Sequence, residues 1–205
     1  PVLINETLWG LGTNIYSAIY AKISTTAIAA VSAVSPIDTL MFTLIYSFGD
    51  ACGILVGNFL GRNEQDKAYE YGIFTTFFMM LVGCLTGIVV FCLRDSILNL
   101  YNLSAESYAS ARIILTILTA SLCFRAITYT IFIGVLRAGG DVRFCLAVDA
   151  GSIWLIGIPI SALLAFGFHL PIETVYLGFM CDELFKVIVV THRLRTRKWM
   201  NVLTA

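Results

Sequence analysis

Long runs of apolar residues alternate with short polar connections along this chain. Six runs are long enough for a membrane-spanning helix, because a hydrocarbon core of about 30 Å needs about 20 helical residues. The pattern therefore predicts an all-α membrane protein, a bundle of six transmembrane helices. The predicted helices cover residues 2–21, 26–60, 69–93, 107–136, 144–168 and 172–191.

The composition agrees with this pattern. Of the 205 residues, 59% are hydrophobic and only 13% are charged, which is far more apolar than a soluble domain. The net charge is zero and no basic face exists outside the C-terminal tail, so a nucleic-acid partner is not expected. We divide the chain into a six-helix lobe, residues 1–191, and a basic cytoplasmic tail, residues 192–205.

The second run is too long to cross a bilayer unbent, and Pro36 lies in its first third. Proline removes a backbone donor and clashes with the preceding turn, so we expect a kink or an interfacial first portion. The run ends with a glycine at every fourth position, a stripe that lets another backbone approach closely. The stripe serves either tight helix packing or a surface on which helices slide between conformations. It consists of Gly49, Gly53, Gly57 and Gly61.

Lysine and arginine gather in alternate connections. Eight lie after the second, fourth and sixth predicted helices, against three on the other side. Because positively charged short loops stay in the cytoplasm, we expect a multi-pass protein of the cell membrane with both ends of this chain cytoplasmic. The eight are Arg62, Lys67, Arg137, Arg143, Arg193, Arg195, Arg197 and Lys198, and the three are Lys22, Arg94 and Arg112.

Glu6 is an acidic residue within an apolar segment, beside Asn5. An ionised side chain inside hydrocarbon is costly unless it faces a bundle interior or water. Glu6 either reaches the headgroup region from about 8 Å inside the membrane or lines a wet cavity. Further polar groups in the segment, which a lipid-facing helix does not need, favour the cavity. They are Thr7, Thr13, Asn14 and Ser17.

Arg125 lies near the middle of the fourth predicted helix. A mid-membrane arginine has a carboxylate or carbonyl partner or points into water. The pair that it forms either serves transport or only holds the bundle together. The candidate partners are Glu6, Asp38 and Asp149.

For two further groups of charges the pattern favours a structural role over a transport site. Asp182 and Lys186 are four residues apart in the sixth predicted helix, so they share a face and neutralise one another, with Glu183 next to them. Asp50, beside the glycine stripe, either lies in a polar contact between helices or lines a cavity.

The sequence holds none of the motifs HExxH, GxSxG or P-loop, so we expect no enzyme, no metal site and no cofactor. Its six cysteines lie in apolar segments without CxxC spacing and are expected to be packing residues. The basic stretch 192–198 precedes Trp199, an arrangement typical of a segment that lies on the anionic inner leaflet.

Four segments of the chain resemble the multidrug and toxic compound extrusion (MATE) transporters, in particular the second six-helix lobe of a twelve-helix protein. The resemblance implies half of a two-lobe antiporter that exports organic cations and amphipathic drugs in exchange for H⁺ or Na⁺. The N-terminal six-helix lobe would then be missing from this sequence. The segments are PVLINETLWGLG, GDACGILVGNFLGRNEQDKA, VLRAGGDVRF and DELFKVIVVTHRLRTRKWMNVL.

The resemblance also bears on the coupling ion. In sodium-coupled bacterial members, a glutamate of the first helix and an aspartate of the fourth helix of this lobe form the cation site. The corresponding positions here fall near Trp9 and Ala126, where neither acid is present. The spacing of PVLINE is similar to that of other bacterial members, so Glu6 is the expected proton carrier, with Asn5 and Arg125 in the coupling site.

We expect Glu6 to alternate between protonated and ionised forms as the lobes rock, so that a proton and a cationic drug exclude each other. Apolar and aromatic walls would hold such drugs by contact and cation–π attraction. Two alternatives remain: a lipid-linked oligosaccharide flippase of the wider superfamily, which needs cationic residues to hold pyrophosphate, and a non-transporting membrane subunit. The expected cavity residues are Trp9, Asn14, Tyr16, Asp38, Phe42, Tyr46, Phe124 and Tyr129.

Overall fold

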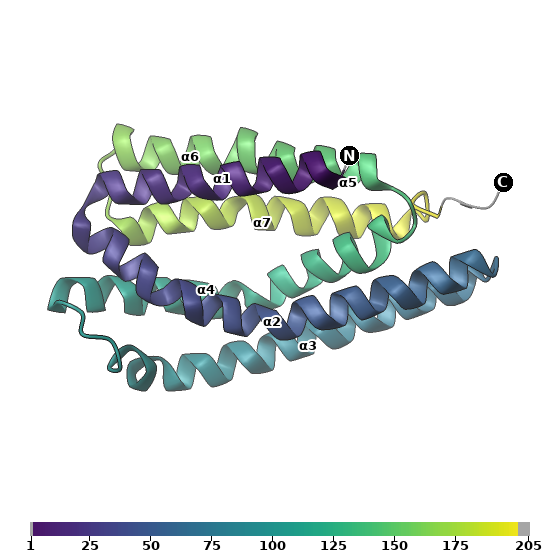
Figure 1. Ribbon diagram of the computed structural model, residues 1–205, viewed down its shortest axis with the longest axis horizontal. Coiled ribbons are helices and arrows are strands. Elements are labelled where there is room, and N and C mark those ends of the chain that lie inside the picture. Colours follow the sequence, from purple (N-terminus) through teal and green to yellow (C-terminus); the bar gives the residue numbers. More distant parts are fainter. Residues whose placement is uncertain (1, 201–205) are drawn as a thin grey trace.

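The computed structural model describes residues 2–200, which form a bundle of six long helices (Figure 1). All six predicted runs are helical, so the predicted all-α fold is confirmed. Two of the six contain wider, π-helical turns. The segments are α1 (Val2–Ile23), α2 (Thr25–Gly61), α3 (Gln65–Leu98), α4 (Ala105–Tyr129) continued by η1 (Thr130–Arg137), α5 (Val142–Ser152) continued by η2 (Ile153–Gly157), α6 (Ile158–Ala162) and η3 (Leu163–Gly167), and finally α7 (Ile172–Arg195).

Four of the six helices are long and apolar enough to cross a membrane by length and composition alone. They are α2, α3, α4 with η1, and the continuous helix from α5 to η3. The other two helices, α1 and α7, run alongside these four (Figure 1) and contribute many of the polar residues inside the bundle.

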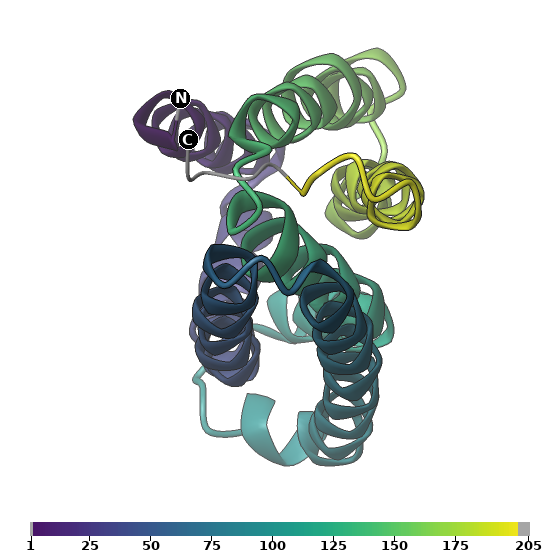
Figure 2. The same cartoon turned by 90° about the vertical axis from the view of Figure 1, so that its right-hand side faces the viewer.

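The helices form two groups (Figures 1 and 2). One group holds α1, α7 and the helix from α5 to η3, and the other holds α2, α3 and α4, with η1 packed against α2. Alternate connections lie at opposite ends of the bundle, and α1 begins at the end where α7 finishes (Figure 1). The beginning of α1 and the end of α7 are therefore on the same side of the bundle. That this side is cytoplasmic stays a prediction.

Short polar residues define where helices begin. The Ser24 hydroxyl accepts a hydrogen bond from the Ala27 backbone N–H at 3.0 Å and caps α2, and Ser104 caps α4 by accepting from the Ser107 N–H. Such caps satisfy backbone donors that the first helical turn leaves free. Fully buried apolar residues of α4, such as Leu118, form the core of the second group.

The long second run is one continuous helix through Pro36. It changes direction along its length (Figure 1), so the proline is accommodated in a bent helix and not at an interfacial break. Only the first half of the glycine stripe lies in close contact with a neighbouring helix. A side chain at Gly49 would meet the Tyr129 ring, and one at Gly53 would meet the backbone of η1, whereas the positions of Gly57 and Gly61 face open space.

The prediction that Trp199 lies on the inner leaflet is wrong. Its side chain is fully buried in the protein, where it packs against Gly139, and its indole N–H donates to the Leu194 carbonyl at 3.2 Å. In addition, α7 continues to Arg195, so the first four residues of the predicted tail are helical, and residues 201–205 of that tail lie outside the described part.

The cysteine prediction holds in part. Cys52 and Cys145 are buried and pack in the core, whereas Cys84, Cys92 and Cys181 are exposed on the outside of the bundle. All six are free thiols.

Candidate functional site

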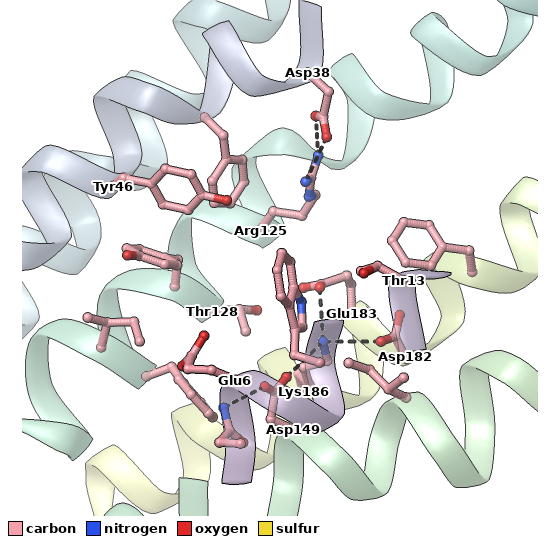
Figure 3. A pocket seen from close by; sticks show the side chains of 18 of the residues that line it. Glu6, Thr13, Asp38, Tyr46, Arg125, Thr128, Asp149, Asp182, Glu183 and Lys186 are labelled. Atoms are coloured by element: carbon pink, nitrogen blue, oxygen red, sulfur yellow. Dashed lines mark hydrogen bonds and ion pairs between the residues drawn. The ribbon is translucent and has the colours of Figure 1, made fainter. Parts of the chain in front are cut away.

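A cavity of about 760 Å³ lies inside the bundle, and Figure 3 shows the side chains around it. Residues from both groups of helices line it, mainly from α1, α2, α4, η1 and α7. Of the predicted site residues, Asn14 and Phe124 do not line the cavity: the Asn14 amide donates to the Gly10 carbonyl on its own helix, and Phe124 is 41% exposed. Those that do are Asn5, Glu6, Trp9, Tyr16, Asp38, Phe42, Tyr46, Arg125 and Tyr129.

Glu6 lies at the wall of the cavity and forms an ion pair with Arg137 of η1. The Arg137 Nη2 atom lies 2.7 Å from the Glu6 Oε1 atom, and the guanidinium also lies over the Phe132 ring. The Glu6 side chain is 53% exposed. Glu6 thus lines the cavity, which is the second of its two interpretations. Its charge is matched by Arg137, which the sequence analysis placed in a connection between helices.

Of its three candidate partners, Arg125 forms an ion pair with Asp38. The two guanidinium nitrogens donate to the two Asp38 carboxylate oxygens at 2.6 and 3.1 Å. Arg125 also stacks over the ring of Phe42, 4.5 Å from its centre. A bidentate pair of this kind is strong and holds both side chains in fixed orientations. It connects α2 to α4 at the cavity wall.

Three aromatic rings continue the wall beside this pair. Tyr46 lies between Phe42 and Tyr129, with ring centres 4.7 and 4.8 Å apart. The Tyr129 hydroxyl donates to Asp50 at 3.5 Å, so Asp50 makes a polar contact between α2 and α4 and also lines the cavity. Aromatic faces next to carboxylates are the type of surface that binds organic cations.

A second group of charges surrounds Lys186, and we call it the Lys186 cluster: Asp149, Asp182, Glu183 and Lys186. The ammonium lies 3.1 Å from Asp182, 3.1 Å from Glu183 and 3.4 Å from Asp149 (Figure 3). The predicted pair of Asp182 and Lys186 is confirmed, but the sequence missed that Asp149 of α5 completes it. An acid in the middle of an apolar run was the available signal for Asp149.

Asn5 joins this cluster from α1. Its amide donates to Asp149 at 3.0 Å, and its side chain is buried. The adjacent residues Asn5 and Glu6 therefore belong to different networks, one around Lys186 and one with Arg137.

The charges lining the cavity are unequal. Six carboxylates and three cationic side chains line it, an excess of three negative charges when all are ionised. Concave walls concentrate such a field and attract cations. The acids are Glu6, Asp38, Asp50, Asp149, Asp182 and Glu183, and the bases are Arg125, Arg137 and Lys186.

Comparisons with known proteins identify relatives of this chain. The model of the MatE family matches residues 1–163. The uncharacterized transporter YisQ of Bacillus subtilis is 27% identical over 168 residues, which is 78% of this chain and 36% of that protein. The probable multidrug resistance protein NorM of Bacillus cereus is 28% identical over 156 residues, 75% of this chain and 34% of that protein.

Two solved structures have a similar fold. The Vibrio cholerae MATE transporter VcmN in its bent form matches with a TM-score of 0.87 at 17% identity, over 99% of this chain and 46% of that one. A MOP superfamily transporter of Pyrococcus furiosus, described as having a binding pocket of reverse polarity, matches with a TM-score of 0.89 at 13% identity, over 100% and 45%. The chain thus spans about a third of the length of these curated relatives and under half of these solved transporters.

Proposed function

The chain belongs to the MatE family, and from this membership and the acidic cavity we propose that it forms the C-terminal half of a secondary multidrug antiporter. The antiporter exports organic cations and amphipathic drugs in exchange for protons. The other half is a second six-helix lobe, and the two lobes enclose the substrate between them. Relatives named as probable multidrug resistance proteins support this proposal.

The excess of carboxylates in the cavity is the observation that carries the proposal. Each arginine at the wall already has a carboxylate partner, Arg125 with Asp38 and Arg137 with Glu6. Among the cavity-lining residues that the structure describes, an anionic substrate would therefore find no unpaired positive group, whereas a cationic one would meet unmatched acids and the aromatic wall. The same argument counts against a flippase for pyrophosphate-linked lipids.

A membrane subunit without transport activity is the second alternative. Such a subunit needs only structural ion pairs, and buried unmatched charge would destabilise it without benefit. The unequal charge in the cavity favours a transporter.

Dye efflux tests the proposal. Drug-sensitive bacterial cells that express the complete protein are loaded with the cation ethidium, with anionic fluorescein as the matched control. We expect faster efflux of ethidium alone, and we expect it to persist without sodium while a proton gradient is present. Efflux of the anion alone, or no efflux of either dye, contradicts the proposal, and strict sodium dependence contradicts proton exchange.

A further inference from the structure

The Lys186 cluster holds more negative charge than its one lysine can match. Three carboxylates lie within 3.4 Å of the ammonium, which leaves two negative charges in excess when all are ionised. The lysine is 6% exposed and Asp182 only 1%. Burying unmatched charge is costly, so a group of this kind is expected to bind a further positive charge.

Several oxygen atoms in and beside the Lys186 cluster have no hydrogen-bond partner within residues 2–200. They are both carboxylate oxygens of Asp182, the amide oxygen of Asn5 and the hydroxyl oxygen of Tyr16. Tyr16 and Asp182 both lie beside Gly157 of η2, where an added side-chain carbon would meet both residues. Buried polar atoms of native proteins nearly always have partners. The Asp182 and Asn5 oxygens can only accept, and the Tyr16 hydroxyl has one hydrogen to donate, so three acceptors with at most one donor indicate an absent donor.

Asp182 differs in this respect from the other two acids. Asp149 accepts a hydrogen bond from Asn5, and Glu183 accepts one from Lys186. Asp182 has only the ion pair with Lys186. Of the three carboxylates, it therefore gains most from a proton, which would also supply the donor that its surroundings lack.

A proton fits this position better than a metal ion. The ammonium of Lys186 already occupies the point between the three carboxylates where a metal ion would bind. A further cation there would be repelled by the lysine, whereas a proton adds to one carboxylate oxygen without displacing it.

Glu6 lacks these properties. Its side chain is half-exposed and its charge is matched by Arg137 at 2.7 Å. Glu6 therefore adds no unmatched charge to the cavity, in contrast to the acids of the Lys186 cluster.

On these grounds we propose that Asp182 is the exchangeable proton site of the transporter, with Asn5, Tyr16, Asp149 and Lys186 as positioning residues. The inference rests on the proposed function, and it assigns to Asp182 the coupling role that the sequence analysis gave to Glu6. Uptake of one proton forms an O–H bond on Asp182 and reduces the excess charge of the cluster from two to one. Release of that proton to the cavity restores the charge that attracts a cationic drug.

Other charges face the cluster from the neighbouring helices. Arg125 of α4 is paired with Asp38 of α2, and Arg137 of η1 is paired with Glu6 of α1, so these four contribute little net charge. Asp50 of α2 lines the same cavity and accepts a hydrogen bond from the Tyr129 hydroxyl. The segments η2, α6 and η3 contain no charged residue. The pH response of drug binding is therefore assigned to the Lys186 cluster and, within it, to Asp182.

Drug affinity at several pH values tests the assignment. Coupling between two ligands changes affinity by about 5- to 150-fold, and the effect is reciprocal. Ethidium affinity of the purified complete protein should therefore fall about tenfold as the pH is lowered from mildly alkaline to mildly acidic. Asp182→Asn should remove this dependence and hold the affinity near the acidic value, while Glu6→Gln should keep it.

The exposed Glu106, in the first turn of α4 and outside the cavity, provides the matched control Glu106→Gln, which should behave like the unmodified protein. A pH dependence that survives in Asp182→Asn, or that disappears in Glu6→Gln, overturns the assignment. If the unmodified protein binds no ethidium at any pH, the proposed function fails, and this outcome is distinct from the previous one.

Infrared spectroscopy keeps the proposal testable if Asp182→Asn does not fold. The unmodified protein should show the carbonyl band of one protonated carboxylic acid at mildly acidic pH, and addition of ethidium should remove it. Asp182→Glu should retain a shifted band. If the unmodified protein shows no such band, or if ethidium leaves the band unchanged, Asp182 is not the exchanging group.

Discussion

The Lys186 cluster and the end of α7 both combine acidic and basic side chains, but the two regions pair them in different ratios. At the end of α7, Arg193 lies 2.6 Å from Asp141 and Arg197 lies 2.8 Å from Asp66, so each acid has one arginine. In the cluster, three acids share one lysine. We call the region at the end of α7 the clasp. It consists of Asp66, Gly139, Asp141, Arg193, Arg197 and Trp199.

The clasp is also completed by apolar contacts. Trp199 is fully buried against Gly139, Arg193 stacks over Phe144, and Arg197 stacks over Tyr69. These contacts join the end of α7 to the beginning of α3, to the loop before α5 and to the beginning of α5. A region with matched charges and a buried tryptophan is suited to one fixed structure, whereas unmatched acids in a cavity are suited to a change of charge.

Removing the lysine of the cluster should have the largest effect on stability. Lys186→Met leaves three acids without their cation, and breaking a buried charge pair on one side costs about 3 to 5 kcal/mol. Thermal unfolding of the purified protein in detergent measures the loss. The double variant Asp182→Asn with Lys186→Met should recover part of the lost stability. An unchanged melting temperature in Lys186→Met would contradict the view that the three acids of the cluster depend on this one lysine.

Trp199→Ala should be the most harmful single change in the clasp. Truncation of a buried aromatic side chain costs about 3 kcal/mol or more because it leaves a cavity. The same unfolding measurement detects this loss, with Trp9→Ala as the control, since Trp9 is 45% exposed at the cavity wall. Equal losses in the two variants would contradict the burial of Trp199.

Asp141→Asn should have a smaller effect. Asp141 is 11% exposed and Arg193 is 25% exposed, so the pair is only partly shielded and its loss should cost about 1 kcal/mol. Raising the salt concentration should reduce the difference between variant and unmodified protein. A loss of stability as large as that of Lys186→Met would mean that the matched ion pairs of the clasp stabilise this protein as much as the Lys186 cluster does.

Asp66→Asn should have the smallest effect. The Asp66 side chain is 85% exposed, and exposed ion pairs contribute about 0 to 1 kcal/mol. We expect a melting temperature within error of the unmodified protein. A clear decrease would show that the pair of Asp66 with Arg197 stabilises the contact between the beginning of α3 and the end of α7. The clasp and the Lys186 cluster would then differ less in their contribution to stability.

The helices and several site residues could be predicted because they depend on local properties of the sequence. A run of apolar residues of sufficient length forms a helix in a membrane whatever its neighbours are. A charge within such a run needs a polar surrounding, which correctly pointed to the cavity for Glu6, Asp38 and Arg125. Which acid would meet Arg125 was not predictable, since the three candidates lie on different helices.

The errors concern residues whose environment depends on distant segments. Asn14 bonds to its own helix and Phe124 lies outside the cavity, because the rotation of each helix decides which residues face inward. Trp199 follows a basic stretch as an interfacial anchor does, yet the loop containing Gly139 provides a place for its ring inside the protein.

The sequence alone determined six helices, their approximate bounds, the family resemblance and the presence of charges that need a wet interior, because each follows from hydropathy and local motifs. Only the tertiary structure decided how those charges are matched. Asp149 and Lys186 are far apart in the chain, and their contact arises from the packing of α5 against α7. The balance of charge in the cavity is a property of that packing, since Coulomb interactions depend on distance in space and not on separation along the chain.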